Sequence, residues 1–194
     1  MFVNAFLFGR EAPFRNRTVA ALALESGDRV VDIGCGMGQN FEYLADAVGP
    51  TGTVVGVDTS REMVRRSLER GGTLDTSVSV LRADATRLPI EDGQFDAVCA
   101  TLSLSAIADA VDVVRDVYRV LRPGGRLVVL DTRSFRTAPG RWLNPFIEGV
   151  SAAITNWYPD ADIADAIEQT FDDIAVRTYH GGTVYIAVGR KSGP

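Results

Sequence analysis

The sequence predicts a single α/β domain built on a doubly wound, mostly parallel sheet. Short β-branched runs alternate with segments of helical spacing along most of the chain, as in proteins that join parallel strands by helical crossovers. The first of these runs ends in a cluster of glycines. Near the C-terminus, two β-rich runs flank a glycine pair, which indicates an antiparallel hairpin. A length of 194 residues suits one such domain.

Five short runs rich in Val, Ile or Leu are expected to form parallel strands. They are Arg29–Ile33, Thr53–Val57, Val78–Leu81, Phe95–Ala100 and Arg126–Leu130. Segments with apolar residues at helical spacing are expected to form the helices between them. They are Gln39–Val48, Arg61–Arg70 with Ser60 as its N-cap, and Asp109–Leu121, which Pro123-Gly124-Gly125 ends.

The predicted hairpin consists of Asp173–Tyr179 and Thr183–Arg190, joined by His180-Gly181-Gly182. Right-handed crossovers between the parallel strands place a ligand beyond the carboxyl ends of those strands, where the strand order reverses. We therefore look for binding residues directly after each parallel strand.

Composition and charge limit the cellular compartments and the classes of partner that we expect. No apolar run reaches the roughly 18 residues that a membrane span needs, and no signal peptide is recognisable, so we expect a cytoplasmic protein. Cys35 and Cys99 are then expected to be free thiols. The net charge of −5, without a basic run, disfavours nucleic acid as a partner because a phosphate backbone would be repelled.

The loop after the first strand, Asp32–Asn40, reads DIGCGMGQN. Its glycines allow a tight turn from strand to helix and let a ligand approach the backbone closely, although such turns also use glycine for structural reasons alone. The spacing differs from the G-x-G-x-x-G of dinucleotide-binding folds, because the third glycine comes one residue earlier. Asp32, at the end of the strand, is suited to neutralise a cationic ligand.

Two further acids follow the next two strands. Asp58 closes the second strand, where a carboxylate accepts hydrogen bonds from both ribose hydroxyls of an adenosine ligand. Asp84 and Ala85 follow the third strand, where a carboxylate can accept from an adenine amino group. Taken alone, Asp58 can equally cap a helix and Asp84 can stabilise a turn. Three acids at three successive strand ends favour one shared ligand.

The segment LRPGGR directly precedes the fifth strand. Together with the glycine loop and the three acids, it makes the chain resemble class I S-adenosylmethionine-dependent methyltransferases. The chain is most similar to the small-molecule and lipid branch with methyltransferase type 11-like domains, which includes the ubiquinone/menaquinone and phospholipid N-methyltransferases. The motifs that carry this resemblance span roughly residues 29 to 131 and read VVDIGCGMGQN, VVGVDTSREMV, LRADATRLPIEDGQFDAV and VYRVLRPGGRLVVLD. The resemblance implies a Rossmann-like seven-stranded sheet whose last strand is antiparallel.

The resemblance also implies S-adenosyl-L-methionine as cofactor and a set of residues that bind it. Asp32, Gly34 and Gly36 would hold the methionine portion and Asp58 the ribose. Met63 would lie against the adenine ring, with Asp84 and Ala85 around its amino group, and Ala100 and Thr101 would lie near the methyl donor. The complete set of expected cofactor-binding residues is Asp32, Gly34, Cys35, Gly36, Gly38, Asp58, Thr59, Met63, Asp84, Ala85, Ala100 and Thr101.

No catalytic residue stands out, and methyl transfer does not require one. In-line displacement at an activated methyl depends mainly on alignment of the nucleophile, and a base is needed only if the acceptor must lose a proton. The fourth strand ends in Ala100-Thr101-Leu102-Ser103 rather than in the Asn/Asp-Pro-Pro-aromatic loop of amino-methylating nucleic-acid enzymes. Asp131 is a lone acid at the end of the fifth strand, so we expect no metal site.

The acceptor is expected to be a small molecule or a lipid-like compound. Two aromatic-rich segments, Met1–Arg17 and Arg133–Tyr158, are candidates for a lid over it. Candidate acceptor-side residues are Trp142, Tyr158 and the only histidine, His180, although packing or loop roles are the simpler reading of each. Segments flanked by Arg and Trp can also dip into a membrane surface, but the net negative charge makes this the less favoured alternative.

We thus expect one domain with four parts: an N-terminal lid or helix (1–28), a cofactor-binding core (29–131), an acceptor-side insertion (132–170) and a C-terminal hairpin (171–190). Two other functions stay open. A non-catalytic scaffold of the same fold would keep the cofactor pocket without turnover. A nicotinamide-dependent oxidoreductase is disfavoured by the glycine spacing and by LRPGG. Oligomeric state and the methylated atom are not encoded in any motif.

Overall fold

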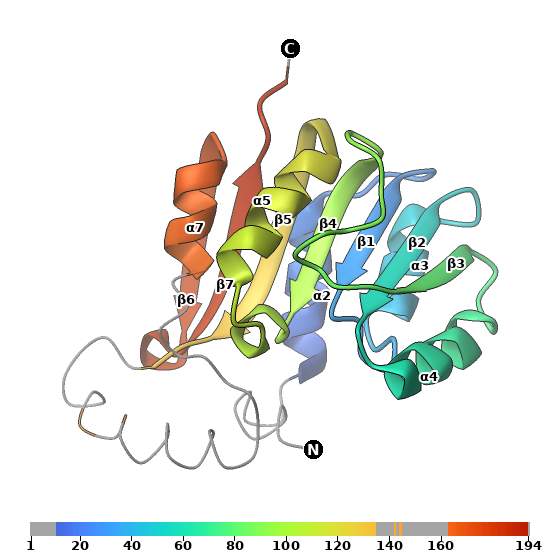
Figure 1. Ribbon diagram of the computed structural model, residues 1–194, viewed down its shortest axis with the longest axis horizontal. Helices are drawn as coiled ribbons and strands as arrows, with labels where there is room; N and C mark the ends of the chain where they lie inside the picture. Colours follow the sequence, from blue (N-terminus) through green and yellow to red (C-terminus); the bar gives the residue numbers. More distant parts are fainter. Residues whose placement is uncertain (1–10, 135–141, 143, 145–162, 194) are drawn as a thin grey trace.

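The computed structural model describes residues 11–134, 142, 144 and 163–193. Seven strands form one sheet of order β3-β2-β1-β4-β5-β7-β6 (Figure 1). The strands are β1 (Arg29–Ile33), β2 (Thr53–Asp58), β3 (Ser77–Arg82), β4 (Phe95–Thr101), β5 (Leu121–Thr132), β6 (Asp173–Tyr179) and β7 (Val184–Arg190). The helices are α2 (Glu11–Leu22), α3 (Phe41–Val48), α4 (Arg61–Gly71), α5 (Ala110–Val120) and α7 (Ile163–Thr170), with 3-10 turns η1 (Leu104–Ala106) and η3 (His180–Gly182).

The pairing of the strands confirms the predicted fold class. Within the group β1 to β5, every pair of neighbouring strands is parallel. By contrast, β7 runs antiparallel to both β5 and β6. The order reverses at β1, which lies between β2 and β4. In doubly wound sheets the ligand binds outside the carboxyl ends of the strands at this reversal.

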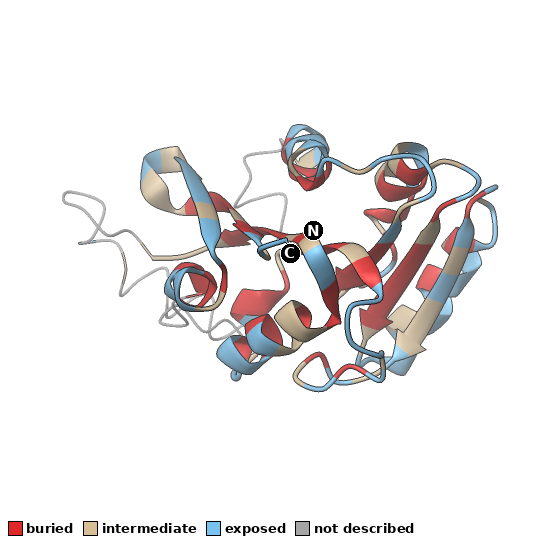
Figure 2. Ribbon diagram, turned by 90° about the horizontal axis from the view of Figure 1, so that it is seen from above, coloured by how far each residue is buried: buried red, intermediate tan, exposed pale blue. Residues whose placement is uncertain are grey.

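Helices cover both faces of the sheet (Figures 1 and 2). Side chains that alternate along a strand point to opposite faces, so Val30 joins the core cluster under α2 and α3, while its neighbour Val31 joins the cluster under α5 and α7. Both valines are fully buried. A central strand buried on both faces explains why the sequence of β1 is a continuous apolar run up to Asp32.

Some element boundaries differ from those that the sequence predicts. The helix α3 begins at Phe41 rather than at Gln39, and the Asn40 side chain makes no capping hydrogen bond. The strand β5 begins at Leu121, which pairs with Phe95 of β4, and the register then shifts so that Ala97 pairs with Arg126. The extra residues of this irregularity belong to the LRPGG segment of β5. The expected hairpin is present, with η3 as its turn.

The only lysine, Lys191, ties the C-terminal end of the chain to α5. Its ammonium donates to the carbonyl oxygens of Tyr118 and Leu121, at 2.7 and 2.8 Å. The same nitrogen lies 4.5 Å from the centre of the Tyr118 ring. A cation at the C-terminal end of a helix satisfies carbonyls that have no partner within the helix and interacts favourably with the helix dipole.

Substitution of Phe41 should destabilise the whole domain. Its ring is fully buried, and a side chain on Gly38 or Gly56 would collide with it at 2.7 or 2.6 Å. We expect Phe41→Ala to lower the free energy of unfolding by about 3–5 kcal/mol, because it leaves a cavity. Leu68→Ala, at a 47% exposed position, is the control and should change it by less than about 0.5 kcal/mol. Urea unfolding followed by circular dichroism measures both, and equal losses would contradict the packing described.

Candidate functional site

A cavity of about 430 Å³ lies at the carboxyl ends of β2 and β3 and beside the segment that follows β4. Its walls come from four segments of the chain that are distant in sequence and meet at this edge of the sheet. The lining residues are Gly34, Val57, Asp58, Thr59, Ala83, Asp84, Ala85, Leu102, Ser103, Ala106 and Ile107. Its volume is within the range of small-molecule sites.

The glycine loop after β1 forms one wall, and two of its glycines are required by geometry. Gly34 has φ +62°, and a Cβ there would lie 2.5 Å from the Cβ of Ser103. Gly38 has φ +76°, and a Cβ there would collide with the ring of Phe41. The loop therefore approaches the segment after β4 as closely as backbone atoms allow.

Asp58, at the end of β2, holds this loop and the start of α4. Its Oδ2 accepts from the amide of Gly36 at 3.0 Å, and its Oδ1 accepts from the amide of Ser60 at 2.8 Å. Ser60 caps α4 as predicted, by accepting from the amide of Met63. Each carboxylate oxygen has capacity for a second donor, so Asp58 can still accept from a hydroxyl in the cavity that it lines.

Asp84, after β3, also lines the cavity and is exposed. Its Oδ1 accepts from both the amide and the hydroxyl of Thr86, at 2.9 and 2.8 Å. These hydrogen bonds lower the pKa of Asp84 below its ordinary value. Asp84 therefore stays a carboxylate at neutral pH, and it can accept from an amino group of a ligand while it also stabilises the turn.

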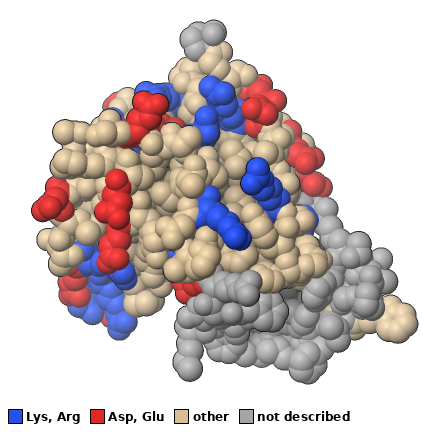
Figure 3. All heavy atoms as spheres, turned by 180° about the vertical axis from the view of Figure 1, so that it is seen from behind, with Lys and Arg blue, Asp and Glu red and all other residues tan. Residues whose placement is uncertain are grey.

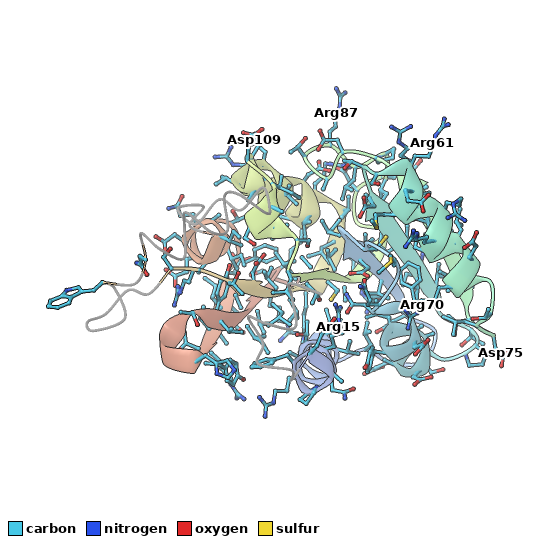
Figure 4. The ribbon with its side chains drawn as sticks, turned by 90° about the horizontal axis from the view of Figure 1, so that it is seen from below. Arg15, Arg61, Arg70, Asp75, Arg87 and Asp109 are labelled. Carbon is cyan, nitrogen blue, oxygen red and sulfur yellow. The ribbon has the colours of Figure 1, made fainter. Side chains whose placement is uncertain are left out.

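Asp32, at the end of β1, belongs to a buried network that reaches α2. The amide nitrogen of Asn40 donates to Asp32 Oδ1 at 2.9 Å and to the hydroxyl of Thr101 at 3.1 Å. The amide oxygen of Asn40 accepts a short hydrogen bond from Arg15, whose guanidinium also pairs with Glu11 at 2.6 Å. Arg15 points inward from α2, whereas Arg61 and Arg87 project outward (Figure 4). The Asn40 amide is thus used in this network rather than as a helix cap.

The second oxygen of the Asp32 carboxyl, Oδ2, is buried and accepts from none of the described residues. Burial raises the pKa of Asp32 to about 7, and the hydrogen bond from Asn40 and the charge of Arg15 offset only part of this. A buried carboxyl with one oxygen unpartnered is costly unless a donor or a cation reaches it. The carboxyl lies behind the glycine loop, outside the lining of the cavity.

The segment after β4 forms the remaining wall, and sequence reasoning missed it. The predicted residues stop at Ala100 and Thr101, yet Leu102, Ser103, Ala106 and Ile107 line the cavity. The Ser103 hydroxyl donates to the carbonyl of Ile33 at 2.8 Å, which joins this segment to the glycine loop. The sequence signal that could have identified these residues is their position directly after a predicted parallel strand.

Asp131 fixes the turn η1 within this wall. It is fully buried, and its carboxylate accepts from the amide and the hydroxyl of Ser105, at 2.9 and 2.5 Å. Burial raises the pKa of Asp131 despite these hydrogen bonds. No group of three or more potential metal ligands occurs in the described part of the chain. Asp131 is thus a structural residue that positions η1.

The structure brings some of the predicted cofactor residues together at the cavity, whereas others are not part of its lining. Gly34, Asp58, Thr59, Asp84 and Ala85 line the cavity. Those outside its lining are Asp32, Cys35, Gly36, Gly38, Met63, Ala100 and Thr101. Of these, Ala100 is buried in the hydrophobic core and Thr101 in the Asn40 network.

The two cysteines are buried free thiols, as predicted. Burial raises the pKa of Cys35 to about 12, and burial also raises the pKa of Cys99. Both therefore stay protonated at neutral pH and are unsuited to act as nucleophiles. Cys35 contributes to the site through its backbone, whose amide donates to the carbonyl of Val57 at 3.0 Å.

Neither Trp142 nor His180, the two predicted acceptor-side residues that the structure describes, lines the cavity. Trp142 is 86% exposed. His180 lies in η3 and lines a different cavity, together with Phe14 and Tyr179. Tyr158 lies outside the described residues, as do most of the two segments expected to form a lid. Among the described helices, none is long and apolar enough to span a membrane.

The fold and the cavity together define a doubly wound α/β protein with a small-molecule site at the carboxyl ends of its strands. Residues 31–129, about half of the chain, match the family model described as a methyltransferase domain. The chain belongs to this methyltransferase family, which confirms the resemblance seen in its motifs.

Two curated proteins and one solved structure illustrate the relationship. An uncharacterised 37.1 kDa protein in transposon Tn4556 of Streptomyces fradiae is 39% identical over 60% of this chain and 33% of its own length. Demethylmenaquinone methyltransferase of Staphylococcus aureus is 33% identical over 66% of this chain and 53% of its own length. The chain thus spans between a third and about half of these relatives.

The solved structure is phosphoethanolamine N-methyltransferase 2 of Haemonchus contortus, in complex with phosphomonomethylethanolamine and S-adenosylhomocysteine. It superposes with a TM-score of 0.74 at 20% identity, over 91% of this chain and 52% of its own. A likeness at this identity establishes the shared fold.

The close approach of Gly34 to Ser103 can be tested against a matched glycine. Gly34 and Gly124 both have positive φ, but only a Cβ at Gly34 meets another atom, because nothing lies within 4 Å of one at Gly124. Both alanine variants carry the same type of backbone strain. We expect Gly34→Ala to lower the free energy of unfolding by about 1–3 kcal/mol more than Gly124→Ala does, through overpacking. Urea denaturation measures the difference, and equal effects would refute the contact.

The raised pKa of Asp32 should appear in the pH dependence of stability. Between its ordinary value of 3.8 and about 7, the folded protein holds a proton on Asp32 that the unfolded chain releases. The contribution of this group to stability therefore falls as pH rises through that window and is constant above it. We expect the free energy of unfolding of the wild type, minus that of Asp32→Asn, to decrease from about pH 4 to about pH 7. A difference independent of pH would contradict the burial of Asp32.

Proposed function

We propose that the chain is an S-adenosylmethionine-dependent methyltransferase that transfers a methyl group to a small-molecule or lipid-like acceptor. The observation that carries this proposal is the placement of three acids at the carboxyl ends of β1, β2 and β3 around one glycine loop. Asp58 and Asp84 line a single cavity, and Asp32 lies buried behind the loop with one oxygen unpartnered. Membership of the methyltransferase family supports the same conclusion.

The residues present fit this cofactor. Asp58 would accept from the ribose hydroxyls, Asp84 from the adenine amino group, and Ala85 would contribute to the adenine wall. Asp32, with the backbone of Gly34 and Gly36, would hold the methionine portion. When bound, the cofactor supplies a methyl group activated by a sulfonium.

The catalytic task of the chain is then positioning. Bringing the acceptor into line with the activated methyl removes most of the entropic barrier to the reaction. The rigid contacts around the cavity, from Ser103 to the glycine loop and from Asp131 to η1, serve this task by fixing the walls. Two carboxylates held at the cavity also favour a cationic ligand over an anionic one.

The class of acceptor is inferred from the relatives. One is named for demethylmenaquinone, and the solved structure contains a phosphorylated ethanolamine derivative. Both are small molecules or lipid precursors. The chain also lacks the Asn/Asp-Pro-Pro-aromatic loop after β4 that amino-methylating nucleic-acid enzymes use. We therefore propose a small-molecule acceptor and no nucleic acid.

Turnover tests the proposal directly. The protein is incubated with methyl-labelled S-adenosylmethionine and a panel of amines, phenols and quinol precursors, and labelled product is separated and counted. We expect label in at least one product class. Binding of the cofactor without any transfer would support the alternative, a non-catalytic scaffold of the same fold.

Thermal stability distinguishes the cofactors. A ligand that binds only the folded state raises the melting temperature, by an amount that grows with the ratio of its concentration to its dissociation constant. We expect S-adenosylhomocysteine to raise the melting temperature and NAD to leave it unchanged, because the glycine loop lacks the dinucleotide spacing. Stabilisation by NAD alone would favour the oxidoreductase alternative.

Asp58 should contribute strongly to affinity. We expect Asp58→Ala to weaken S-adenosylhomocysteine binding by about 1–3 kcal/mol, because the ribose hydroxyls lose their acceptor. Asp75→Ala is the matched control, an exposed acid that projects outward at the opposite end of α4 (Figure 4), and it should leave the affinity unchanged. Isothermal titration calorimetry measures both. If Asp58→Ala binds as tightly as the wild type, Asp58 is not part of the site.

A further inference from the structure

A second concave surface lies between α2 and the edge strand β6, on the sheet face that α2 covers. We call it the arginine groove, because Arg17, Arg126 and Arg177 are among the residues that line it. Its volume is about 500 Å³, and none of its lining residues is shared with the cavity at the carboxyl ends of β2 and β3. It is therefore separate from the proposed cofactor site.

The floor of the groove is apolar because of how the elements pack. The helix α2 packs against β4, β5 and β7. Between α2 and β6, the sheet presents Ala175 of β6 beside Val188 of β7, and Ile186 two residues further along β7. Ala20 forms part of the facing wall on α2. Small side chains on both walls leave room for a narrow apolar group.

The three arginines make no ion pair with any residue in the described part of the chain, and no acidic residue lines the groove. Elsewhere, arginines such as Arg70, Arg119 and Arg122 do pair with acids. The protein has a net charge of −5, yet three arginines without an acidic partner among the described residues lie around this one groove. Positive charge is therefore concentrated at the groove. Figure 3 shows basic side chains standing among uncharged atoms near the middle of this rear face.

Arg17 is held in place by aromatic rings. Its guanidinium carbon lies 5.5 Å from the ring centres of both Phe14 and Tyr179, within the range of cation–π contacts. Arg17 and Tyr179 also line an adjoining cavity of about 390 Å³ beside Pro13 and His180. The two cavities therefore adjoin at Arg17 and Tyr179, and together they extend the groove along α2.

We propose that the arginine groove binds an organic anion: a phosphate or carboxylate head joined to an apolar chain. Guanidinium groups present planar pairs of donors that match these heads in two-point hydrogen bonds. The aliphatic floor and the adjoining aromatic residues would bury the chain. The proposal is independent of the methyltransferase reaction, because the groove shares no residue with the cofactor cavity.

Calorimetric titration with decyl phosphate, below its micelle-forming concentration, tests the proposal. We expect saturable binding that weakens at least tenfold in the double variant Arg17→Gln, Arg177→Gln. Arg115→Gln, an exposed arginine of α5 on the other face of the sheet, is the control and should bind like the wild type. Thermal melting and S-adenosylhomocysteine titration of each variant verify that folding and cofactor binding are retained, which separates failure here from failure of the proposed function.

Two further ligands complete the test. Decyltrimethylammonium has the same chain with a cationic head and should not bind in the groove, so the double variant should not change any binding of it. Vesicles that contain phosphatidylglycerol, compared with pure phosphatidylcholine, distinguish a lipid headgroup from a soluble anion; groove-dependent binding of either source supports the proposal. It is overturned if decyl phosphate and anionic vesicles both fail to bind, if the double variant binds like the wild type, or if the double variant weakens binding of the cationic amphiphile equally.

Discussion

The buried carboxyl of Asp32 is the constraint on which the site depends. It lies near the end of β1, which is buried from Val30 onward, and a charge there is costly without partners. Asn40 supplies one donor and joins Asp32 to Thr101 of β4 and, through Arg15, to α2. This single amide thus connects three elements directly behind the glycine loop. The second carboxyl oxygen has no donor among the described residues, and in our proposal a cationic cofactor satisfies it.

Other hydrogen bonds fix the backbone of the cavity walls. Asp58 holds Gly36, Ser103 holds the carbonyl of Ile33, and Asp131 holds η1 through Ser105. Each is a hydrogen bond between a side chain at or just beyond a strand end and a backbone atom of another element. Because backbone atoms are fixed in this way, the cavity is shaped before any ligand arrives. Such preorganisation lowers the entropic cost of binding and of alignment.

The sequence predicted the strands, the hairpin and the strand-end acids because each depends on local signals: apolar runs, turn glycines and position relative to a strand. Contacts between residues that are distant in sequence could not be predicted from such local signals. Asn40 was predicted only as a residue of the helix Gln39–Val48, yet its amide is used by Asp32 and Thr101. Leu102 and Ser103 were missed because their place in the cavity depends on the neighbouring loop rather than on their own type. His180 was predicted to lie in the hairpin turn, and the fold places that turn beside α2, which no local signal indicated.

A carbon-13 NMR titration of the Asp32 carboxyl, assigned by comparison with Asp32→Asn, tests the central claim most directly. In the protein alone, the carboxyl should titrate near pH 7 because it is buried. With S-adenosylmethionine bound, a positive charge nearby should shift the titration to markedly lower pH. A carboxyl that titrates at the same pH in the presence and absence of saturating S-adenosylmethionine would contradict the account.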